Sequence, residues 1–349
     1  MPEATMRAAR FEAATSSLTV TDVPVPTPGP GEVLVKVLAC GICLSDVHLI
    51  DGTLPGPLPV VTPGHEAAGV VEHAGERVSG WRPGDRVLLG AGRACGVCAT
   101  CARGIPECAA PQIMGFGYDG AWAQYVVVPG GALTPIPDEI PLEQACVLAD
   151  AVATPYAALT ERAGLRPAES IGLWGIGGLG VHAVQIARMV GAAPIIALDP
   201  LPAARERALS LGADEALDPT APDVQDRIRA LTGGRGLDVA VDLVGANVVL
   251  AQCVASLARN GRAVMVGLSF EEMRLGPGVV LGVQSQSLLG NLGYQRQHLE
   301  QLVTLVRTGR LDISGSVSGV MPLDDVVAGV EKLRSKEGNP IRLVVQPWS

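Results

Sequence analysis

The pattern of hydrophobic and polar positions changes along the chain, and this change divides the chain into two parts. In the first part, short runs rich in β-branched residues are separated by glycine and proline, which is typical of short strands joined by turns. The predicted strands are 33–38, 69–72, 86–89 and 125–128. From about Pro141 the sequence becomes rich in alanine, and a helical pattern runs through 142–159.

Strand and helix patterns alternate beyond this helical stretch. The predicted strands are 170–174, 194–198, 239–244 and 263–266, and the predicted helices are 181–190, 203–211, 224–231 and 249–257. This alternation predicts an α/β domain with a doubly wound parallel sheet. Near Leu288 it gives way to a helix at 297–308 and a last strand at 341–345, which we expect to rejoin the first domain.

Length, composition and charge narrow the class of protein. A chain of 349 residues favours two domains, because single cores stop growing below roughly 250–300 residues. No apolar run reaches the roughly 20 residues that span a bilayer, and the N-terminus lacks the apolar segment of a signal peptide. The net charge of −9 argues against a nucleic-acid partner. We therefore expect a cytoplasmic protein with a small-molecule partner, neither nucleic acid nor membrane.

A glycine-rich sequence follows the first predicted strand of the second part. Residues 175–180 read Gly-Ile-Gly-Gly-Leu-Gly and lead into a predicted helix. Gly175 permits a tight turn, Gly177 lets a pyrophosphate approach the backbone, and Gly180 lets helix and strand pack closely. The helix N-terminus adds partial positive charge. This order of elements predicts a dinucleotide site.

Asp199 ends the next predicted strand, where it can accept hydrogen bonds from the adenosine ribose. The same carboxylate would repel a 2′-phosphate, so NAD is favoured over NADP. A structural alternative is that the glycines only cap a strand and that Asp199 begins a turn before Pro200. Strand, glycines, helix and acid in order favour nucleotide binding.

Four of the eight cysteines cluster. Three repeat at three-residue intervals and the fourth follows shortly afterwards: Cys95, Cys98, Cys101 and Cys108. In a reducing compartment such thiols indicate metal ligands, and this spacing predicts a closed, structural zinc site. Unliganded thiols and an iron–sulfur cluster are the alternatives. The ferredoxin-type run places its fourth cysteine sooner and follows it with proline, whereas Ala109 follows Cys108.

A second, dispersed set of polar residues combines Cys43, His65 and Asp150. Each has a structural account when taken singly, Cys43 as a small core residue, His65 as a turn histidine and Asp150 as a helix-associated acid. Together with the motifs at 41–48, 64–66, 95–108 and 175–180, they stand in the order found in zinc-containing medium-chain alcohol dehydrogenases. The sequence resembles this family, and bacterial secondary-alcohol dehydrogenases within it, over essentially the whole chain.

The resemblance implies a fold of two domains. A mainly β, GroES-like catalytic domain would comprise 1–151 and 289–349, and a Rossmann domain binding NAD would comprise 152–288. It also implies two zinc ions per chain, one in each cysteine-containing site. Family members pair through the edge of the nucleotide-domain sheet, so we expect a homodimer or homotetramer in which the apolar stretch 279–289 supplies this edge.

The resemblance also assigns site residues. Cys43, His65 and Asp150 would bind the catalytic zinc and leave one position open for the substrate oxygen. Many relatives have cysteine at the place of Asp150. Cys146 is a nearby alternative, but Asp150, four residues before Thr154, matches the family's spacing. Asp46 would orient His65, and Glu66 would approach the zinc transiently.

Proton transfer and cofactor binding complete the implied site. Ser45 would accept the alcohol proton and pass it through the cofactor ribose toward His48. The implied cofactor residues are Thr154, Gly175, Gly177, Gly178, Leu179, Gly180, Asp199 and Arg342. Two departures from the family stand out. The gap from Cys101 to Cys108 is one residue short, and Leu44 replaces a basic residue or histidine near the pyrophosphate.

The function implied is reversible hydride transfer between NAD(H) and a primary or secondary alcohol or the matching carbonyl. One alternative is a reductase of the same fold acting on an activated C=C or C=N bond. Another is a non-catalytic, nucleotide-binding redox sensor that uses the four clustered cysteines. Retention of Cys43, Ser45, His48 and His65 favours the alcohol dehydrogenase.

Overall fold

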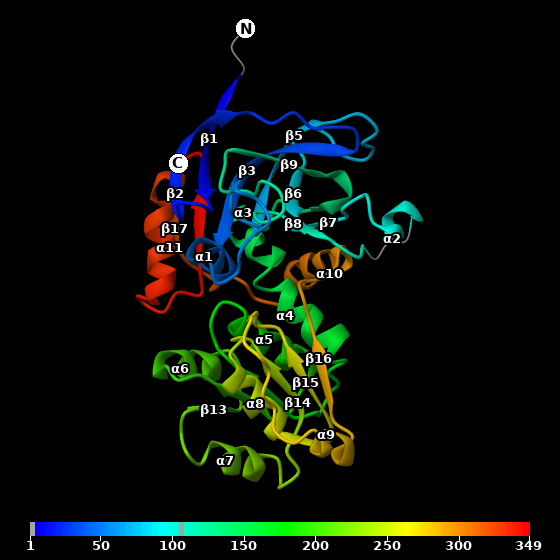
Figure 1. Ribbon diagram of the computed structural model, residues 1–349, viewed down its shortest axis with the longest axis vertical. Coiled ribbons are helices and arrows are strands. Elements are labelled where there is room, and N and C mark those ends of the chain that lie inside the picture. Colours follow the sequence, from blue (N-terminus) through cyan, green and yellow to red (C-terminus); the bar gives the residue numbers. More distant parts are fainter. Residues whose placement is uncertain (1–3, 105–107) are drawn as a thin grey trace. The chain divides into compact units, whose positions relative to one another are not determined.

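The structure is a computed structural model that describes residues 4–104 and 108–349. The chain forms two compact units (Figure 1), the first comprising Met1–Asp150 and Leu299–Ser349 and the second Ala151–His298. The chain passes from the first unit to the second after Asp150, one residue before the expected domain boundary at 151. The return lies at Leu299 instead of 289, because the strand β16 (Ser287–Gly290) still belongs to the sheet of the second unit. No described helix is long and apolar enough to cross a membrane.

The first unit is mainly β. Its large sheet has the strand order β10-β6-β5-β3-β18-β17, with β9 also paired to β3. The bounds are β3 (Glu32–Ile42), β5 (Ala67–Ala74), β6 (Arg86–Leu89), β9 (Tyr125–Pro129), β10 (Leu133–Pro135), β17 (Val317–Pro322) and β18 (Arg342–Gln346). The predicted strands of this part correspond to β3, β5, β6 and β9. The last strand pairs antiparallel with β3, with Leu343 opposite Ile42.

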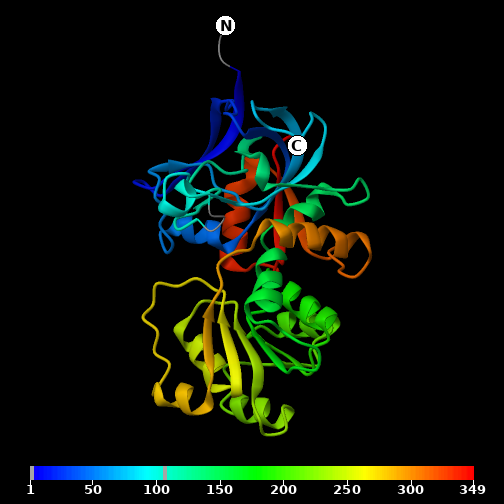
Figure 2. The same ribbon diagram turned by 90° about the vertical axis from the view of Figure 1, so that its right-hand side faces the viewer.

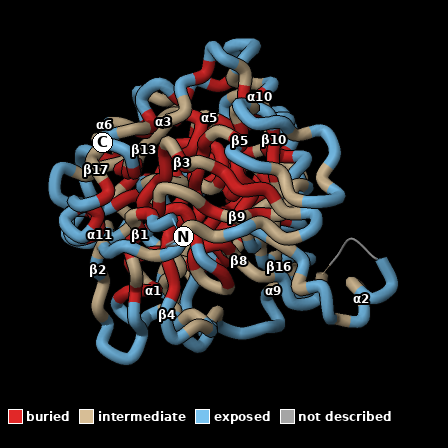
Figure 3. Tube along the Cα trace, turned by 90° about the horizontal axis from the view of Figure 1, so that it is seen from above, coloured by how far each residue is buried: buried red, intermediate tan, exposed pale blue. Residues whose placement is uncertain are grey.

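Smaller elements surround this sheet. A separate sheet joins β2 (Ser17–Pro24), β1 (Thr5–Glu12) and β4 (Val60–Val61), and a short ribbon joins β7 (Gly92–Arg93) and β8 (Gln112–Ile113). The helices are α1 (Leu44–Asp51), α2 (Ala99–Ala102), α3 (Leu142–Ala145) and α11 (Val326–Ser335), with one-turn helices η1 (Gly130–Ala132), η2 (Cys146–Ala149) and η4 (Leu323–Asp325). Buried valines of β3, β5, β6 and β9 form the centre of the core, which Figure 3 shows in red.

The second unit is the expected doubly wound domain. Its parallel sheet has the order β13-β12-β11-β14-β15-β16. Figure 2 shows this unit in green to orange. The strands are β11 (Ile171–Trp174), β12 (Ile195–Leu198), β13 (Glu215–Leu217), β14 (Leu237–Asp242), β15 (Leu257–Met265) and β16, and the helices are α5 (Gly180–Val190), α6 (Pro202–Ser210), α7 (Val224–Leu231), α8 (Asn247–Ala255) and α9 (Val279–Gln284). The sequence pattern missed β13, which has three residues. The stretch 279–289, expected to supply the sheet edge as a whole, forms the exposed helix α9 and then most of the edge strand β16.

The helix predicted over 142–159 is wrong as a single element. The structure divides this stretch into α3, η2, α4 (Ala153–Ala157) and a π-helical turn, η3 (Ala158–Arg162). Asp150 separates η2 from α4 and has φ −152° and ψ −60°, outside the helical region. The break coincides with the crossover between the units. Helix α10 (Arg296–Arg307), predicted at 297–308, carries the chain back to the first unit.

Candidate metal and nucleotide sites

The side chains of Cys43, His65 and Asp150 converge in the first unit. Oδ2 of Asp150 lies 3.3 Å from Sγ of Cys43 and 3.7 Å from Nε2 of His65. All three potential ligand atoms lie within 4.8 Å of one another, and only Asp150 is not buried. Thiolate, imidazole and carboxylate are all zinc ligands, and three protein ligands leave a tetrahedral ion one open position. The residues present therefore fit a zinc ion of the catalytic type.

Local interactions around α1 hold two of these residues in place. The backbone N–H of Cys43 donates to Oδ2 of Asp46 at 2.9 Å, which caps the start of the helix. Oδ1 of the fully buried Asp46 lies 3.1 Å from Nδ1 of His65. Asp46 thereby fixes the imidazole so that Nε2 faces Cys43 and Asp150. Burial raises the pKa of the Cys43 thiol, so a metal ion must displace its proton.

Arg342 connects two carboxylates beside this cluster. Its Nε lies 2.9 Å from Oε2 and 3.1 Å from Oε1 of Glu66, and one terminal nitrogen lies 3.4 Å from Oδ2 of Asp150. Glu66 is fully buried and Arg342 is 2% exposed. Burial raises the pKa of Glu66 to about 7, although the charge of Arg342 acts against this. The contact of Arg342 with a cofactor stays a prediction, and its observed partners are these carboxylates.

Gly41 explains how Glu66 fits beside the cluster. A Cβ at Gly41 would lie 2.0 Å from Oε2 of Glu66, so any other residue would displace the carboxylate. The pairing of β3 with β18 places Val344 opposite Gly41 and Leu343 opposite Ile42, so Arg342, the residue before Leu343, lies at the end of β3 that leads to Cys43. Sequence reasoning found Glu66 and Arg342 separately. It could not find their pairing, because they are 276 positions apart and belong to different motifs.

Ser45 and His48 both lie on α1. Oγ of Ser45 lies 3.7 Å from Sγ of Cys43, so the hydroxyl borders the metal cluster. Nδ1 of His48 lies 3.7 Å from Oδ2 of Asp51, and the His48 side chain is 38% exposed. No hydrogen bond joins Ser45 to His48, both of which lie in the described part of the chain. The relay from Ser45 through a cofactor hydroxyl to His48 stays a prediction.

The four clustered cysteines meet around α2. Sγ of Cys95 lies 4.0 Å from that of Cys101, and Sγ of Cys98 lies 3.9 Å from that of Cys108. Hydrogen bonds from Thr100 and from nearby backbone N–H groups lower the pKa of Cys98 to about 5. The thiol of Cys101 contacts Cys98, and this contact raises the pKa of Cys101 to about 12. Thiols so close ionise together only beside a cation. Four sulfurs at these distances fit a closed zinc site.

This cysteine loop, residues 95–108, is partly or fully exposed where it is described (Figure 3). Residues 105–107, which lie within the shortened gap between Cys101 and Cys108, are outside the described residues. Cys108 nevertheless lies with the other three sulfurs. The shorter gap therefore leaves all four side chains together.

The glycine-rich turn between β11 and α5 has the geometry of a nucleotide loop. Gly175 has φ +91°, which favours glycine. A Cβ at Gly180 would lie 2.0 Å from the carbonyl oxygen of Gly175, so turn and helix touch there. A Cβ at Gly177 would meet no atom within 4 Å. Packing within the chain therefore does not require glycine at 177, and the approach of a pyrophosphate to this backbone stays a prediction.

Asp199 follows β12 and contacts this turn directly. Oδ2 accepts the N–H of Ile176 at 2.8 Å, and Oδ1 accepts that of Leu201 at 2.9 Å. Sequence reasoning assigned Asp199 to the ribose and gave a turn before Pro200 as the alternative. The bond from Leu201 fits that turn, whereas the bond from Ile176 was not predicted. A carboxylate has about four acceptor positions, so it can still accept ribose hydroxyls.

Three further residues, His182, Leu179 and Thr154, lie in the helices of this unit or at their ends. The side chain of the buried His182, to which the sequence gave no role, contacts the carbonyl oxygen of Gly178 at 2.7 Å. Leu179 is the N-cap of α5, and the buried Thr154 lies in α4. The sequence offered one indication of this contact, because His182 is four residues after Gly178 and four residues span about one helical turn.

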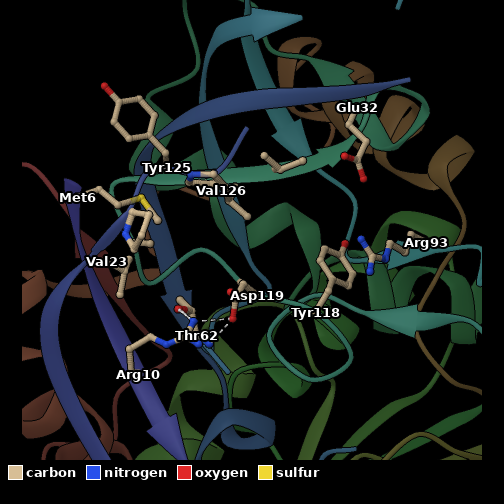
Figure 4. Close-up of a pocket in the computed structure, with 15 residues that line it drawn as sticks. Met6, Arg10, Val23, Glu32, Thr62, Arg93, Tyr118, Asp119, Tyr125 and Val126 are labelled. Atoms are coloured by element: carbon tan, nitrogen blue, oxygen red, sulfur yellow. Dashed lines mark hydrogen bonds and ion pairs between the residues drawn. The ribbon is translucent and has the colours of Figure 1, made fainter. Parts of the chain in front are cut away.

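A separate cavity of about 460 Å³ lies in the first unit (Figure 4). Arg10 in its wall contacts Asp119 at 2.7 Å and Thr62 at 3.0 Å, and the guanidinium of Arg93 lies 3.9 Å from the centre of the Tyr118 ring. None of the predicted site residues lines this cavity.

Comparison with known proteins places the chain in a family. The sequence matches the profile of the alcohol dehydrogenase GroES-like domain over residues 29–138 and that of the zinc-binding dehydrogenase over residues 178–308. An NAD-dependent alcohol dehydrogenase of Sulfurisphaera tokodaii is 32% identical, with 95% of this chain and 97% of that protein covered. A probable zinc-binding alcohol dehydrogenase of Mycobacterium tuberculosis is also 32% identical, with 99% and 89% covered.

Solved structures agree with this placement. The crystal structure of the alcohol dehydrogenase from the archaeon Aeropyrum pernix superposes with a TM-score of 0.88 at 31% identity, covering 98% of this chain and 100% of that one. The similarity extends over both units, and it includes the sequence segments that carry the cysteine cluster and the glycine-rich turn. The chain therefore belongs to the zinc-binding alcohol dehydrogenases of the medium-chain dehydrogenase/reductase family.

Proposed function

We propose that this chain is a zinc-dependent, NAD-linked alcohol dehydrogenase that interconverts a primary or secondary alcohol and its aldehyde or ketone. One observation carries the proposal: the ligand atoms of Cys43, His65 and Asp150 lie within 4.8 Å of one another. The same chain has a glycine-rich turn followed by Asp199, and relatives that match 95% and 92% of it are named alcohol dehydrogenases.

The cofactors supply the central chemistry. A zinc ion held by Cys43, His65 and Asp150 would act as a Lewis acid on the substrate oxygen, and NAD would accept or return the hydride. The protein would supply a thiolate once the metal has displaced the Cys43 proton, the carboxylate of Asp150, an imidazole held by Asp46, and a site bordered by the Ser45 hydroxyl. Phe116 packs near His65, with the ring centres 5.7 Å apart, and gives this part of the site an apolar surface.

The side chains of α1 are suited to proton transfer. Ser45 is next to the metal cluster and would accept the alcohol proton. His48, one turn later and 38% exposed, would exchange that proton with solvent through its imidazole. The hydroxyl and the imidazole lie on one helix, so their spacing is fixed by the backbone.

We further propose two zinc ions per chain and NAD in preference to NADP. The four sulfurs of Cys95, Cys98, Cys101 and Cys108 support a second, structural ion with no open position. The position of Asp199 beside the glycine-rich turn supports NAD, because a carboxylate there disfavours a 2′-phosphate. Eight free thiols also support our assignment of the protein to the reducing cytoplasm.

We propose that the chain forms a homodimer or homotetramer through the edge of the second unit's sheet. β16 is the edge strand, and the apolar side chains of the preceding helix are exposed. Val279 is 69%, Val280 48% and Val283 64% exposed. A second copy that pairs along this edge would cover both the strand and the valines.

A substrate panel tests the proposed activity. Purified protein of measured zinc content is assayed with primary and secondary alcohols and ketones, each with NAD(H) and with NADP(H). An activated alkene is included as the competing substrate class, and Asp150→Ala protein is the control. We expect alcohol-dependent NADH formation that the control lacks. Reduction of the alkene without turnover of any alcohol or ketone would contradict the proposal.

A further inference from the structure

Arg342 contacts both carboxylates beside the proposed zinc site, Glu66 and Asp150. We propose that Arg342 is a positioning residue that decides which of these carboxylates reaches the metal. It holds Asp150 in the ligand set and limits Glu66 to a transient approach, so that one coordination position stays open for substrate. This inference rests on the proposed zinc site.

The position of Glu66 makes such a residue necessary. Glu66 follows His65 directly, so the backbone that presents a ligand also presents a second carboxylate. The carboxylate of Glu66 is not part of the converging ligand group, and both of its oxygens lie within 3.1 Å of Nε of Arg342. A fourth protein ligand would close the site, as in structural zinc sites.

The charges around the site favour this arrangement. Glu66 and Arg342 are both essentially removed from solvent, with exposures of 0% and 2%. With Cys43 as thiolate, the three anions Cys43, Asp150 and Glu66 balance a divalent ion and the guanidinium. Asp46 lies on the other side of His65, where N–H groups of Cys43 and Gly64 satisfy it. Without Arg342, the buried charge of Glu66 is relieved by a proton or by the metal ion itself.

The shape of the arginine side chain suits this task. Its Nε faces Glu66 while a terminal nitrogen faces Asp150, so one rigid group fixes the separation of the two carboxylates. Lysine has one compact ammonium and cannot provide two donors at fixed positions on one plane. We therefore expect Arg342→Lys to preserve the charge but to separate the carboxylates less well.

Cobalt substitution of the zinc sites tests the inference, because the visible spectrum of cobalt reports its ligand number and geometry independently of activity. Wild-type protein, Arg342→Met, Arg342→Lys and Arg342→Met combined with Glu66→Gln are compared. Subtracting the spectrum of Asp150→Ala protein removes the contribution of the cysteine loop, which is the same in all variants. Metal content, kcat and circular dichroism are measured on the same samples.

We expect Arg342→Met to keep its metal but to show the weaker absorption of a higher-coordinate ion. Its kcat should fall about 10- to 100-fold, the usual effect of residues that orient ligands. The double variant should return toward the wild-type spectrum and regain about tenfold in kcat, because a neutral amide is a poorer ligand than the carboxylate of Glu66. Arg342→Lys should lie between wild type and Arg342→Met.

Two results would overturn the inference while leaving the proposed function intact. One is a wild-type cobalt spectrum in Arg342→Met. The other is a double variant no closer to wild type than the single one. If Arg342→Met does not fold, the cobalt spectra and kcat of Arg342→Lys and of Arg342→Lys combined with Glu66→Gln are compared in its place. Absence of metal from the Cys43 site in wild-type protein would instead overturn the proposed function, and the inference with it.

Discussion

Asp150 is the residue on which the proposed catalytic site depends most. It lies where the helical stretch breaks, and it brings a carboxylate toward both Cys43 and His65. We predict that Asp150→Ala loses zinc from this site, so that about one ion per chain remains in the cysteine loop, and that activity nearly vanishes. Metal analysis and kcat measure the two effects.

Asp138→Ala is a matched control for this variant, because the Asp138 side chain is 94% exposed in the same unit. It should keep the wild-type zinc content and kcat. Full zinc and wild-type turnover in Asp150→Ala would show that Asp150 is not a ligand. Cys146 would not replace it without movement, because its thiol donates to the carbonyl oxygen of Glu143.

Ser45 should behave differently from Asp150, because it borders the metal cluster without belonging to it. We predict that Ser45→Ala keeps its zinc while alcohol oxidation falls by roughly 10²- to 10⁴-fold, the contribution of a positioned proton acceptor. His48→Gln should cost less, and most at low pH, where hydroxide does not replace the base. Loss of zinc from Ser45→Ala would contradict these separate roles.

The residues of the site differ in how far the sequence could predict them. The resemblance paired Asp46 with His65, and these side chains lie 3.1 Å apart, but the bond from the N–H of Cys43 to Asp46 was not predicted. Contacts of Arg342 depend on the pairing of β18 with β3, which a local pattern does not contain. Asp199 was predicted as an acid at the end of a strand, but its bond to Ile176 depends on the fold of the turn.

Elements with a strong local pattern were predicted well, and elements defined by tertiary contacts were not. The helix α7 has the bounds that its amphipathic pattern predicts, 224–231. The stretch 142–159 has an equally helical composition, yet it breaks at Asp150. Alanine-rich sequence has high helix propensity throughout, so it carries no signal for a break that the site and the crossover require.

The glycine-rich turn offers a prediction that separates folding from binding. Gly180→Ala should lower the free energy of unfolding by about 3 kcal/mol, because its Cβ would lie 2.0 Å from the carbonyl oxygen of Gly175. Gly177→Ala should leave stability unchanged or raise it by up to about 1 kcal/mol, because its Cβ meets no atom within 4 Å.

The substitution at Gly177, which should not lower stability, should nevertheless weaken the binding of NAD. Gly177→Ala protein should be fully folded and still bind NAD more than about tenfold more weakly, because the methyl group occupies the path of the pyrophosphate. Urea unfolding and NAD titration measure the two quantities. Wild-type NAD affinity in Gly177→Ala would show that the pyrophosphate does not approach this backbone.

At the scale of the whole molecule, the sequence predicted two domains with an interrupted first domain. The expected return at 289 was ten residues early, because the apolar stretch 279–289 was treated as one edge. The structure uses this stretch for two elements, helix α9 and strand β16. Both elements are apolar, so the sequence pattern did not predict the turn between them at Ser285, which has a positive φ of 52°.

The exposed valines of α9 give a prediction for assembly. We expect wild-type protein to be a dimer or tetramer in light scattering. Val283→Glu should weaken this assembly, because it would bury a charge in the contact between copies. Val327→Glu on α11 is the matched control, since Val327 is 48% exposed in the first unit. A wild-type monomer at working concentration would contradict the prediction.

The central claim is that zinc at the site of Cys43, His65 and Asp150 enables NAD-linked alcohol oxidation. The most direct measurement follows NADH formation from the best alcohol of the panel during removal of zinc by a chelator and during its return. The open site should release its ion before the closed cysteine site does. We predict that activity falls with the first zinc lost per chain and returns when zinc is restored. Undiminished NADH formation by folded, zinc-free protein would contradict the account.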